Sequence, residues 1–380
     1  MKKQLSKMDK PLLWVMFIGL VFGLFMVGSA SSLKAFMKKG DSFYFFWRQF
    51  IFIIIGLVCF FIITKNKINK WNFLIYLFSF GVTGVLIYVL LKGEVSNGIK
   101  GWLFILGFGI QPSEFAKTAT ILFLAITQEK LIKQKNLKDW VRLVPFLLVF
   151  IYALLILVQP DLGTMVILLG IAIVIFLVIP FDVKFKRLIV CCTLFLVGML
   201  GLILMFNPSI MKDFQKDRFN FKDPCSRYKE RSGYQLCNSL IAINGGGVLG
   251  KHFGNSTQKF LYLPEAHTDF IFPIMIEECG LLCGIAVMIG YFIIIWRILA
   301  IGRRSYNLQG AIICYGVATY ISLHIILNLG GVMGLFPLTG VPLPFFSYGG
   351  SFMINLLICL GFVERVAIEN VTFEQKHLVR

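Results

Sequence analysis

A short segment between Lys259 and Phe270 carries the densest group of side chains capable of acid–base chemistry. It contains Glu265, His267 and Asp269, and a long apolar run begins immediately after it. A carboxylate at such a boundary, beside partly apolar neighbours, can have its pKa raised and act as a general base. The spacing does not choose among the three side chains, and an aspartate at such a position is often only a helix cap.

Two other segments place a proline and then an acidic residue at the start of an apolar run, Pro112 before Glu114 and Pro160 before Asp161. Proline suits the first position of a helix, and a carboxylate suits its positive first turn. Helix capping is the favoured interpretation for Asp161. Glu114 and Lys117, three residues apart on one helical face, predict an ion pair. A cation in this setting suits a pyrophosphate or carboxylate ligand, so we favour substrate contact for that pair.

The composition decides what kind of protein must position these residues. Of 380 residues, 58% are hydrophobic and 15% are charged. Soluble globular proteins are about 45–50% apolar and about 25% charged, so an ordinary soluble enzyme is excluded. The formal net charge of +18 is what the positive-inside rule produces in a membrane protein, and we give nucleic-acid binding no weight.

Ten apolar runs predict ten transmembrane helices and an all-α integral membrane fold, in a single domain over residues 1–380. The first run is long and lacks a small-residue cleavage site, so we interpret it as a retained helix rather than a cleaved signal peptide. The runs span residues 12–30, 44–64, 72–91, 113–127, 141–158, 161–180, 187–206, 270–297, 308–330 and 349–366.

Lys and Arg residues in the short loops indicate the orientation of these helices. With a cytoplasmic N-terminus, the inner segments hold most of these cations, and Lys34, Lys38 and Lys39 are the main exception on the outer side. An even number of helices places both termini in the cytoplasm. Residues 207–269 then form a long, polar extracytoplasmic loop between the seventh and eighth helices, and a loop of that length is usually functional.

Charged groups in a bilayer normally face a cavity or a partner. Such groups gather at the outer ends of the even-numbered helices, among them Arg48, whereas the odd-numbered helices carry nothing comparable. Glu277 and Glu278 are adjacent and point in different directions, so at most one is expected to face a shared site. Residues 337–351 predict irregular backbone that lines a cavity. A single site at the outer face accounts for this distribution.

The segment Gly245–Gly250 matches the G-x-G-x-x-G pattern and nearly matches a P-loop. Both motifs need a preceding strand and a following helix in a cytoplasmic nucleotide-binding unit, and the segment is predicted outside with no strand pattern before it. We reject both motifs and interpret the glycines as residues that allow close backbone packing.

Most of the nine cysteines lie in apolar runs, where packing of a small polarizable side chain is the simpler interpretation. Cys225 and Cys237 instead lie in the predicted extracytoplasmic loop, where disulfides can persist. We hypothesise that these two residues pair.

Several separated motifs together resemble the SEDS family of integral-membrane glycosyltransferases, which includes FtsW, SpoVE and RodA. The resemblance covers essentially the whole chain, and the segments Gln258–His267 and Pro342–Ser351 are more similar to the division and sporulation branch, FtsW and SpoVE. The motifs are Gly28–Ser31, Arg48-Gln49, Gln111–Lys117, Gln159–Thr164, Leu263–Phe272 with Glu277–Gly280, and Pro337–Ser351.

The chain departs from the family pattern at three places. Phe352 stands where a second serine is usual, and Lys100-Gly101-Trp102 lacks the common arginine before tryptophan. Pro273 replaces a small residue; it predicts a helix start or kink and places Asp269 in a loop.

The resemblance implies an inverting glycosyltransferase that polymerises lipid II into β-1,4-linked glycan strands at the outer face of the bacterial cytoplasmic membrane, with undecaprenyl pyrophosphate leaving. The family's essential acid carries over to Asp269, which would take the proton from the acceptor hydroxyl. Arg48, Lys117 and Lys259 are candidates to steady the pyrophosphate. Other substrate-binding candidates are Glu114, Asp161, His267, Glu278, Ser347 and Ser351. Glu114, Asp161 and Glu278 would orient the cations or help to hold a divalent cation.

The implied partners are undecaprenyl-linked glycan, membrane lipid, a class B penicillin-binding protein that acts as transpeptidase, and other divisome or elongasome proteins. Two other functions compete with the enzyme. A flippase for lipid II needs a polar route through both leaflets, whereas the costly charges gather at the outer helix ends. A scaffold without chemistry would not need so many acids at one face.

Overall fold

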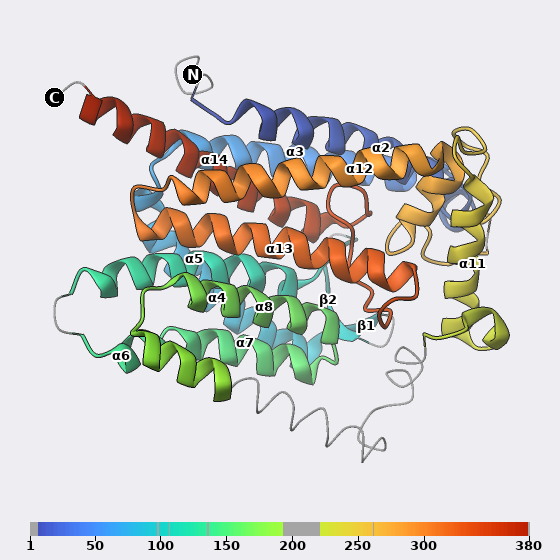
Figure 1. Cartoon of the computed structure of the whole chain (residues 1–380). Coiled ribbons are helices and arrows are strands. Elements are labelled where there is room, and N and C mark those ends of the chain that lie inside the picture. The colour runs from blue at the N-terminus through green and yellow to red at the C-terminus, as the bar shows by residue number, and fades with distance from the viewer. Residues whose placement is uncertain are drawn as a thin grey trace.

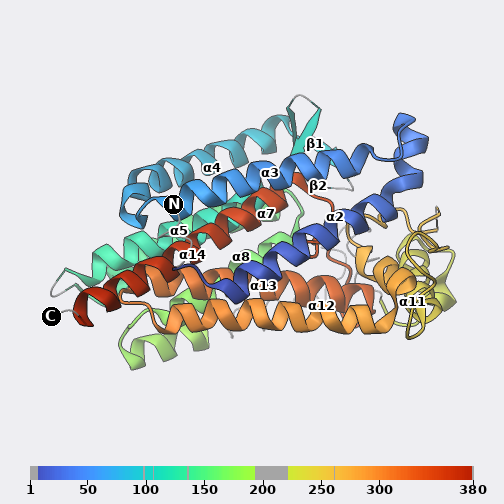
Figure 2. The same ribbon diagram turned by 90° about the horizontal axis from the view of Figure 1, so that it is seen from above.

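A computed structural model describes residues 7–96, 99–105, 107–134, 137–192, 221–260 and 262–378. Within this part of the chain, the fold is a bundle of long helices that lie side by side (Figure 1). The shorter helix α11 (Arg231–Gly246) crosses one end of the bundle, which we call the α11 end (Figures 1 and 2). The last turns of α14 lie at the opposite end in both views.

Seven helical segments in the described ranges are long and apolar enough to cross a membrane. They are α2 (Lys10–Lys39), α3 (Tyr44–Lys65), η1 (Ile68–Trp71) with α4 (Asn72–Lys92), α6 (Asp139–Leu143) with α7 (Phe146–Val158), α12 (Ile271–Arg303), α13 (Leu308–Val332) and α14 (Gly350–Leu378). The run predicted at 141–158 is divided between α6 and α7, with Pro145 between them. Ten crossings and the cytoplasmic position of the termini remain predictions.

Two further helices match predicted runs but are not among those seven. The apolar helix α8 (Leu162–Val178) has 17 residues. Helix α5 (Pro112–Ile132) is buried along most of its length and carries Glu114, Lys117 and several threonines. Lipid would penalise these polar groups, and the neighbouring helices α4, α8 and α13 cover them instead. The predicted run 187–206 lies mostly outside the described residues.

A small antiparallel sheet, which the sequence did not lead us to expect, connects α4 to α5. Its order is β1 (Glu94–Ser96), β2 (Ile99–Ile105) and β3 (Phe108–Ile110). Gly107 adopts a φ of 79° just before β3, a conformation that glycine takes without steric cost. β1 and β3 have only three residues each, too few for alternation in the sequence to reveal them.

Burial in the bundle increases toward its centre. Helix α14 packs along α3, and α13 packs against α8, α12 and α5. Large apolar side chains on α2, α3, α4 and α7 are exposed instead. Such extended apolar surfaces are unfavourable in water, and they fit a protein whose outer helices face lipid.

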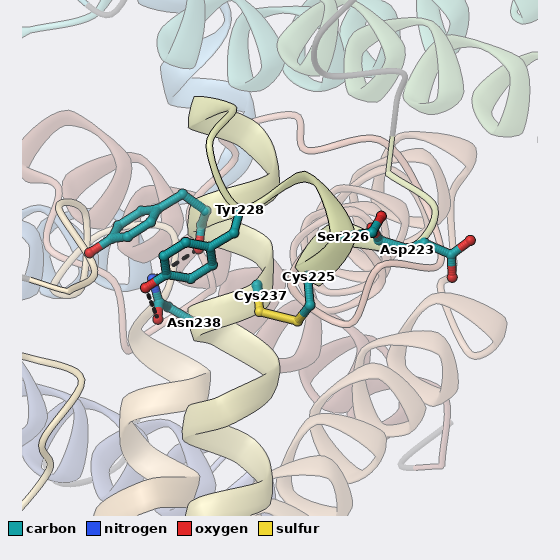
Figure 3. The surroundings of a disulfide bond; sticks show 7 residues. Asp223, Cys225, Ser226, Tyr228, Cys237 and Asn238 are labelled. Carbon is teal, nitrogen blue, oxygen red and sulfur yellow. Dashed lines mark hydrogen bonds between the residues drawn. A yellow bond between two sulfur atoms is a disulfide. The ribbon is translucent and has the colours of Figure 1, made fainter.

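The segment predicted as a polar loop at 207–269 contains helical structure in its described part. The short helix η3 (Pro224–Arg227) precedes α11, and Figure 3 shows the disulfide that joins Cys225 in η3 to Cys237 in α11. The two sulfur atoms are 2.02 Å apart. The rings of Tyr228 and Tyr234 pack beside this bond, with centroids 4.8 Å apart. Residues 207–220 lie outside the described ranges.

The glycine-rich segment packs against a kink in α12 at Gly280, where φ is 82°. A Cβ atom on Gly246 would lie 2.2 Å from the carbonyl oxygen of Ile276, and one on Gly250 would lie 2.3 Å from that of Glu278. No larger residue fits such a backbone approach. The interpretation of these glycines as packing residues is confirmed.

Candidate functional site

A cavity of about 520 Å³ lies among the helix ends. Its walls come from the last turns of α2, the first turns of α3, α5 and α8, the sheet, and segments 265–269, 339–342 and 348–352. Six of the residues selected from the sequence line it, namely Arg48, Glu114, Asp161, His267, Asp269 and Ser351. Four others do not, namely Lys117, Lys259, Glu278 and Ser347.

Four acidic side chains and three lysine or arginine side chains line the cavity. The carboxylates are those of Glu114, Asp161, Glu265 and Asp269, and the cations are those of Lys34, Lys38 and Arg48. Acids that can accept a proton therefore share one space with cations that can attract an anion. This combination suits a ligand that carries both hydroxyl groups and negative charge.

Asp269 lies in a turn just before α12, as predicted, and Pro273 is in the first turn of that helix. The side-chain nitrogen of Asn328 on α13 donates to the Asp269 carbonyl oxygen at 2.9 Å and to that of Val341 at 2.8 Å. On another side, a Cβ atom on Gly340 would lie 3.4 Å from Asp269 Oδ2. These contacts fix the backbone of Asp269 while its side chain contributes to the cavity wall.

Lys34 and Glu265 form a partly exposed ion pair in the same wall. Lys34 Nζ is 3.5 Å from Glu265 Oε2, and the two side chains are 25% and 26% exposed. The ammonium group also donates to the carbonyl oxygen of Pro264 at 2.6 Å, and Thr268 Oγ1 donates to Glu265 Oε2 at 3.0 Å. Pairs of this kind contribute about 0–1 kcal/mol. Lys34 can therefore exchange Glu265 for another anion at little cost.

Arg48 is held by contacts from α3 and from the sheet. Its guanidinium group hydrogen-bonds to the hydroxyl of Tyr44 and donates to the carbonyl oxygen of Gly107 at 2.6 Å. The guanidinium carbon lies 4.4 Å from the ring centroid of Phe108, in cation–π contact. The short sheet thus positions the arginine at the cavity.

The predicted ion pair between Glu114 and Lys117 is confirmed, with Lys117 Nζ 2.8 Å from Glu114 Oε1. Only Glu114 lines the cavity, because Lys117 is fully buried and also contacts His324 Nε2 at 3.0 Å. The expectation that Lys117 contacts a ligand stays a prediction. Burial removes it from solvent, and both of its close partners belong to the protein.

His324 connects the ion pair to irregular backbone beside the cavity. An ammonium group only donates, so His324 Nε2 accepts from Lys117 and the protonated Nδ1 donates to the carbonyl oxygen of Pro342 at 3.0 Å. His324 and Asn328 belong to α13, the ninth predicted helix. The prediction that the odd-numbered helices lack such groups is therefore wrong. The two residues are hard to recognise from the sequence, because each is an isolated polar residue in an apolar run.

Asp161 is the N-cap of α8, as favoured from the sequence, and its Oδ1 accepts from the backbone N–H of Thr164 at 3.1 Å. Its other oxygen accepts from Gln111 Nε2 at 3.0 Å, and the residue lines the cavity. Pro112 is the first residue of α5, as predicted. Pro160 precedes the cap of α8, so its predicted place at the first helical position is wrong.

His267 lies between two aromatic rings. Its ring centroid is 4.7 Å from that of Phe45 and 5.7 Å from that of Tyr348. Burial, reinforced by the charges of Lys34 and Lys38, lowers the pKa of His267 to about 3. The imidazole is therefore neutral at pH 7 and is a weak base.

The two serines near α14 have different positions. Ser351 lines the cavity and its Oγ accepts from the backbone N–H of Gln111 at 3.1 Å. Ser347 is fully buried; its Oγ donates to the carbonyl oxygen of Thr268 at 2.6 Å and accepts from the backbone N–H of Leu343 at 2.8 Å. Its hydroxyl fixes the loop next to Asp269, and the predicted substrate contact of Ser347 stays a prediction.

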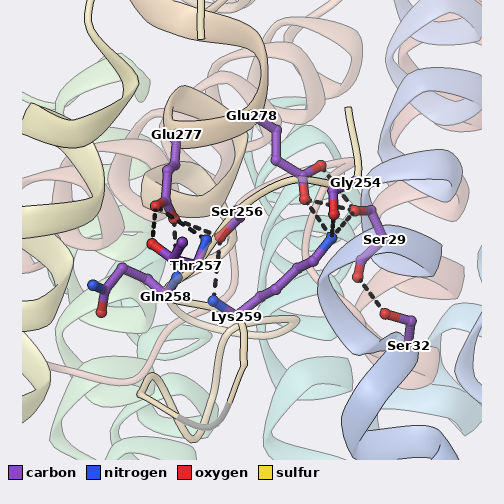
Figure 4. A network of polar contacts seen from close by, with 9 residues as sticks. All are labelled: Ser29, Ser32, Gly254, Ser256, Thr257, Gln258, Lys259, Glu277 and Glu278. Atoms are coloured by element: carbon purple, nitrogen blue, oxygen red, sulfur yellow. Dashed lines mark hydrogen bonds and ion pairs between the residues drawn. The ribbon is translucent and has the colours of Figure 1, made fainter. Parts of the chain in front are cut away.

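Lys259 and Glu278 form a separate buried network (Figure 4). Lys259 Nζ lies 2.7 Å from Glu278 Oε1, 3.0 Å from Ser29 Oγ and 2.6 Å from the carbonyl oxygen of Gly254. Neither charged residue lines the cavity, and their predicted substrate contacts stay predictions. Glu277 has different partners from Glu278, as expected, because it accepts from the hydroxyls of Ser256 and Thr257, and it also does not line the cavity.

Sequence reasoning missed two lysines in the cavity wall, Lys34 and Lys38. A signal was present, because both were exceptions to the positive-inside rule. Of the three carboxylates proposed to hold a divalent cation, Glu114 and Asp161 line the cavity and Glu278 does not. Among the described residues, no group of three or more His, Cys, Asp or Glu side chains could hold a metal ion. Glu278, one of the proposed three, is instead paired with Lys259.

Comparisons with known proteins show similarity over nearly the whole chain. Residues 10–372 match the family model for FtsW, RodA and SpoVE, described as "Cell cycle protein". The chain is 36% identical to stage V sporulation protein E of Bacillus subtilis (strain 168) over 364 residues, 94% of this chain and 96% of that protein. It is 36% identical to the probable peptidoglycan glycosyltransferase FtsW of Wigglesworthia glossinidia brevipalpis over 380 residues, 97% of this chain and 96% of that protein.

Two solved structures share the fold. RodA, the rod shape determining protein of Thermus thermophilus, superposes with a TM-score of 0.67 at 24% identity, covering 95% of this chain and 96% of that chain. A chain from a structure described as "Structural coordination of polymerization and crosslinking by a peptidoglycan synthase complex" has a TM-score of 0.76 at 24% identity, covering 96% and 98%.

Proposed function

The chain belongs to the SEDS family of FtsW, RodA and SpoVE proteins, and from that premise we propose that it is a peptidoglycan glycosyltransferase of cell wall synthesis. It acts as one transmembrane domain and polymerises lipid II into β-1,4-linked glycan strands. Undecaprenyl pyrophosphate is the leaving group, and Asp269 is the catalytic base. The cavity at the α11 end faces the outside of the cytoplasmic membrane.

One observation carries this proposal further than the others. The side chain of Asp269 shares a cavity of about 520 Å³ with Lys34, Lys38 and Arg48. A glycosyl transfer with a pyrophosphate leaving group needs a base for the acceptor and positive charge for the departing anion. Both kinds of group are available within this one space.

The proposed glycosyl transfer forms one glycosidic bond, breaks one bond to pyrophosphate and moves one proton. The 4-hydroxyl oxygen of the acceptor sugar attacks the anomeric carbon of the donor and forms the new glycosidic bond. The bond from that carbon to the pyrophosphate oxygen breaks, and its electron pair leaves with undecaprenyl pyrophosphate. The hydroxyl proton passes to the Asp269 carboxylate. Attack on the face opposite the leaving group inverts the anomeric centre.

The two competing bases are less suitable. His267 has a pKa of about 3 because it is buried beside lysines, and a base so far below neutral pH has little affinity for the proton. Glu265 pairs with Lys34 and accepts from the hydroxyl of Thr268, and the family resemblance carries the essential acid over to Asp269 rather than to Glu265. Asp269 is supported by its position in the cavity wall and by its fixed backbone.

The remaining assignments follow from the same site. Arg48, Glu114, Asp161, His267 and Ser351 contact or orient substrate at the cavity. The chain acts with a class B penicillin-binding protein, which would cross-link the new strands, and with other divisome or elongasome proteins. The resemblance of its fold to a chain in a peptidoglycan synthase complex supports such a partner.

Polymerisation of purified lipid II, with and without a cognate class B penicillin-binding protein, tests the proposal. Wild-type protein should make glycan strands, and Asp269→Asn should lose at least about 100-fold in rate because the proton acceptor is gone. Asp223→Asn is the matched control. Asp223 is exposed and has a φ of 44°, which asparagine tolerates, so this variant should behave as wild type.

Outcomes of this assay separate the competing functions. Strand formation by folded Asp269→Asn protein at the wild-type rate would show that Asp269 is not the base. Wild-type protein that makes no strands with its partner, yet moves labelled lipid II across vesicle membranes, would support the flippase instead.

A further inference from the structure

The last turns of α2 bring two lysines, Lys34 and Lys38, into the wall of the cavity that contains Asp269. They are four residues apart, so both lie on the same face of the helix. We propose that Lys34 and Lys38 bind the phosphate groups of the leaving polyprenyl pyrophosphate. This assignment deepens the function proposed above and rests on it.

The burial and the ion pairs of two other candidate cations, Lys117 and Lys259, favour this assignment. Lys117 and Lys259 are almost fully buried, and each lies within 2.8 Å of a carboxylate oxygen. Recruiting either one to a ligand would leave a buried carboxylate without its cation, which is strongly unfavourable. Neither residue lines the cavity. Of the three cations selected from the sequence, Lys117 and Lys259 are therefore engaged in buried ion pairs, and only Arg48 lines the cavity.

Lys34 differs from them in each of these respects. Its side chain is 25% exposed, and its carboxylate partner Glu265 is 3.5 Å away and 26% exposed. The closest contact of its ammonium group is the neutral carbonyl oxygen of Pro264 at 2.6 Å. An incoming phosphate can therefore replace a weak pair without leaving a buried charge unpaired.

Lys38 is exposed and adds a second positive charge one turn further along the helix. Lysines in the last turn of a helix also interact with its negative end, which is the simpler explanation for Lys38 and Lys39. That explanation does not apply to Lys34, which lies more than a turn before the end and contacts the segment before Asp269. Only Lys34 and Lys38 of the three line the cavity.

Arg48 completes the set from the neighbouring helix α3. Its guanidinium group is already held by Tyr44 and Gly107, so it presents a fixed charge, whereas the lysines are adjustable. A pyrophosphate offers several anionic oxygens, and three cations around one space can meet them together. The arrangement places these cations in the same cavity as the base, as a single displacement requires.

Binding of undecaprenyl pyrophosphate to the purified full-length chain in detergent tests this proposal without requiring turnover. We expect Lys34→Gln to weaken binding about tenfold, as loss of a charge-assisted hydrogen bond predicts, and Lys34→Arg to retain most of it. Lys38→Gln should have a smaller effect in the same direction. Lys39→Gln removes the same charge outside the cavity lining and should bind as wild type.

Asp269→Asn is included because it separates this proposal from the proposed function. It should lose polymerisation and still bind undecaprenyl pyrophosphate, since the base is not part of the phosphate site. Equal affinity of wild type, Lys34→Gln and Lys39→Gln would overturn the proposal whether or not the chain polymerises lipid II. Normal binding by Lys34→Gln together with inactive Asp269→Asn would leave the function intact and reject the lysines.

Two comparison ligands identify the source of the phosphate. Undecaprenyl monophosphate should bind more weakly than the pyrophosphate, and the difference should shrink in Lys34→Gln. Phosphatidylglycerol, an ordinary anionic lipid, should compete poorly. If phosphatidylglycerol bound as tightly as undecaprenyl pyrophosphate and with the same dependence on Lys34, the lysines would be a general lipid headgroup site and the proposal would be wrong.

Discussion

Replacement of Lys117 by methionine should destabilise the protein by about 3–5 kcal/mol. Lys117 is fully buried, and its Nζ lies 2.8 Å from Glu114 Oε1 and 3.0 Å from His324 Nε2. Methionine fills similar space without a charge, so Glu114, only 3% exposed, would be left as a buried carboxylate without its cation. Glu114 Oε2 has no hydrogen-bond partner among the described residues, so nothing there offsets the loss.

A second substitution separates the cost of the unpaired charge from the cost of altered packing. In Glu114→Gln with Lys117→Met, both charges are absent, and the remaining loss should be about 1–2 kcal/mol, chiefly from the unpartnered His324 nitrogen. The double variant should therefore be more stable than Lys117→Met alone. The difference in stability between these two variants should be about 2–3 kcal/mol.

Equilibrium unfolding in mixed micelles, followed by tryptophan fluorescence, measures these differences. Lys133→Met is the matched control, because Lys133 also pairs with a glutamate at 2.8 Å but is 72% exposed. That variant should change the free energy of unfolding by less than about 1 kcal/mol. If Lys117→Met had an equally small effect, or if the two substitutions at the buried pair were simply additive, the reasoning would be refuted.

Three further outcomes are expected. Gly340→Ala should lower the free energy of unfolding by about 1–2 kcal/mol and slow polymerisation, because the residue has a φ of 70° and a new Cβ would lie 3.4 Å from Asp269 Oδ2. Wild-type stability and activity of this variant would contradict the prediction. The pKa of His267 is lowered to about 3, so between about pH 6.5 and 3 the unfolded chain binds a proton that the folded chain does not. The free energy of unfolding should therefore fall as the pH drops through this range, by at most about 1.4 kcal/mol per pH unit. Unfolding midpoints measured from pH 7 to 4.5 should show this slope, and His267→Phe should reduce it. Cleavage between Cys225 and Cys237 should leave the fragments joined on a non-reducing gel. The double variant Cys225→Ser, Cys237→Ser should lose about 2–3 kcal/mol of the free energy of unfolding. Free thiols at both positions by mass spectrometry would exclude the bond.

Local signals in the sequence identified the helices well. Apolar runs correspond to α2, α3, α4, α12, α13 and α14, because lipid around the bundle and the packed interior within it both disfavour polar side chains. The i,i+3 spacing of Glu114 and Lys117 was enough to predict their contact, since both belong to one helix. The acidic first turn of α5 and the cap at Asp161 followed from the same kind of local geometry.

Contacts between distant segments were harder to predict. Lys259 meets Glu278 and Ser29 because α2 and α12 pack together, and nothing in any one of these segments specifies that meeting. Lys34 approaches Pro264 for the same reason. From the sequence we therefore selected two lysines that do not line the cavity, Lys117 and Lys259, and overlooked the two that do, Lys34 and Lys38.

By itself, the sequence determined that this protein is a helical membrane protein and, through its motifs, which family it belongs to. Hydropathy and helical periodicity are properties of a single helix, so residues that are close in the sequence are enough to detect them. The tertiary structure decided which charges are buried against one another and which line the cavity with Asp269. That choice depends on how helices far apart in the chain pack, because distant segments bury a pair such as Glu114 and Lys117 and bring Glu278 to Lys259.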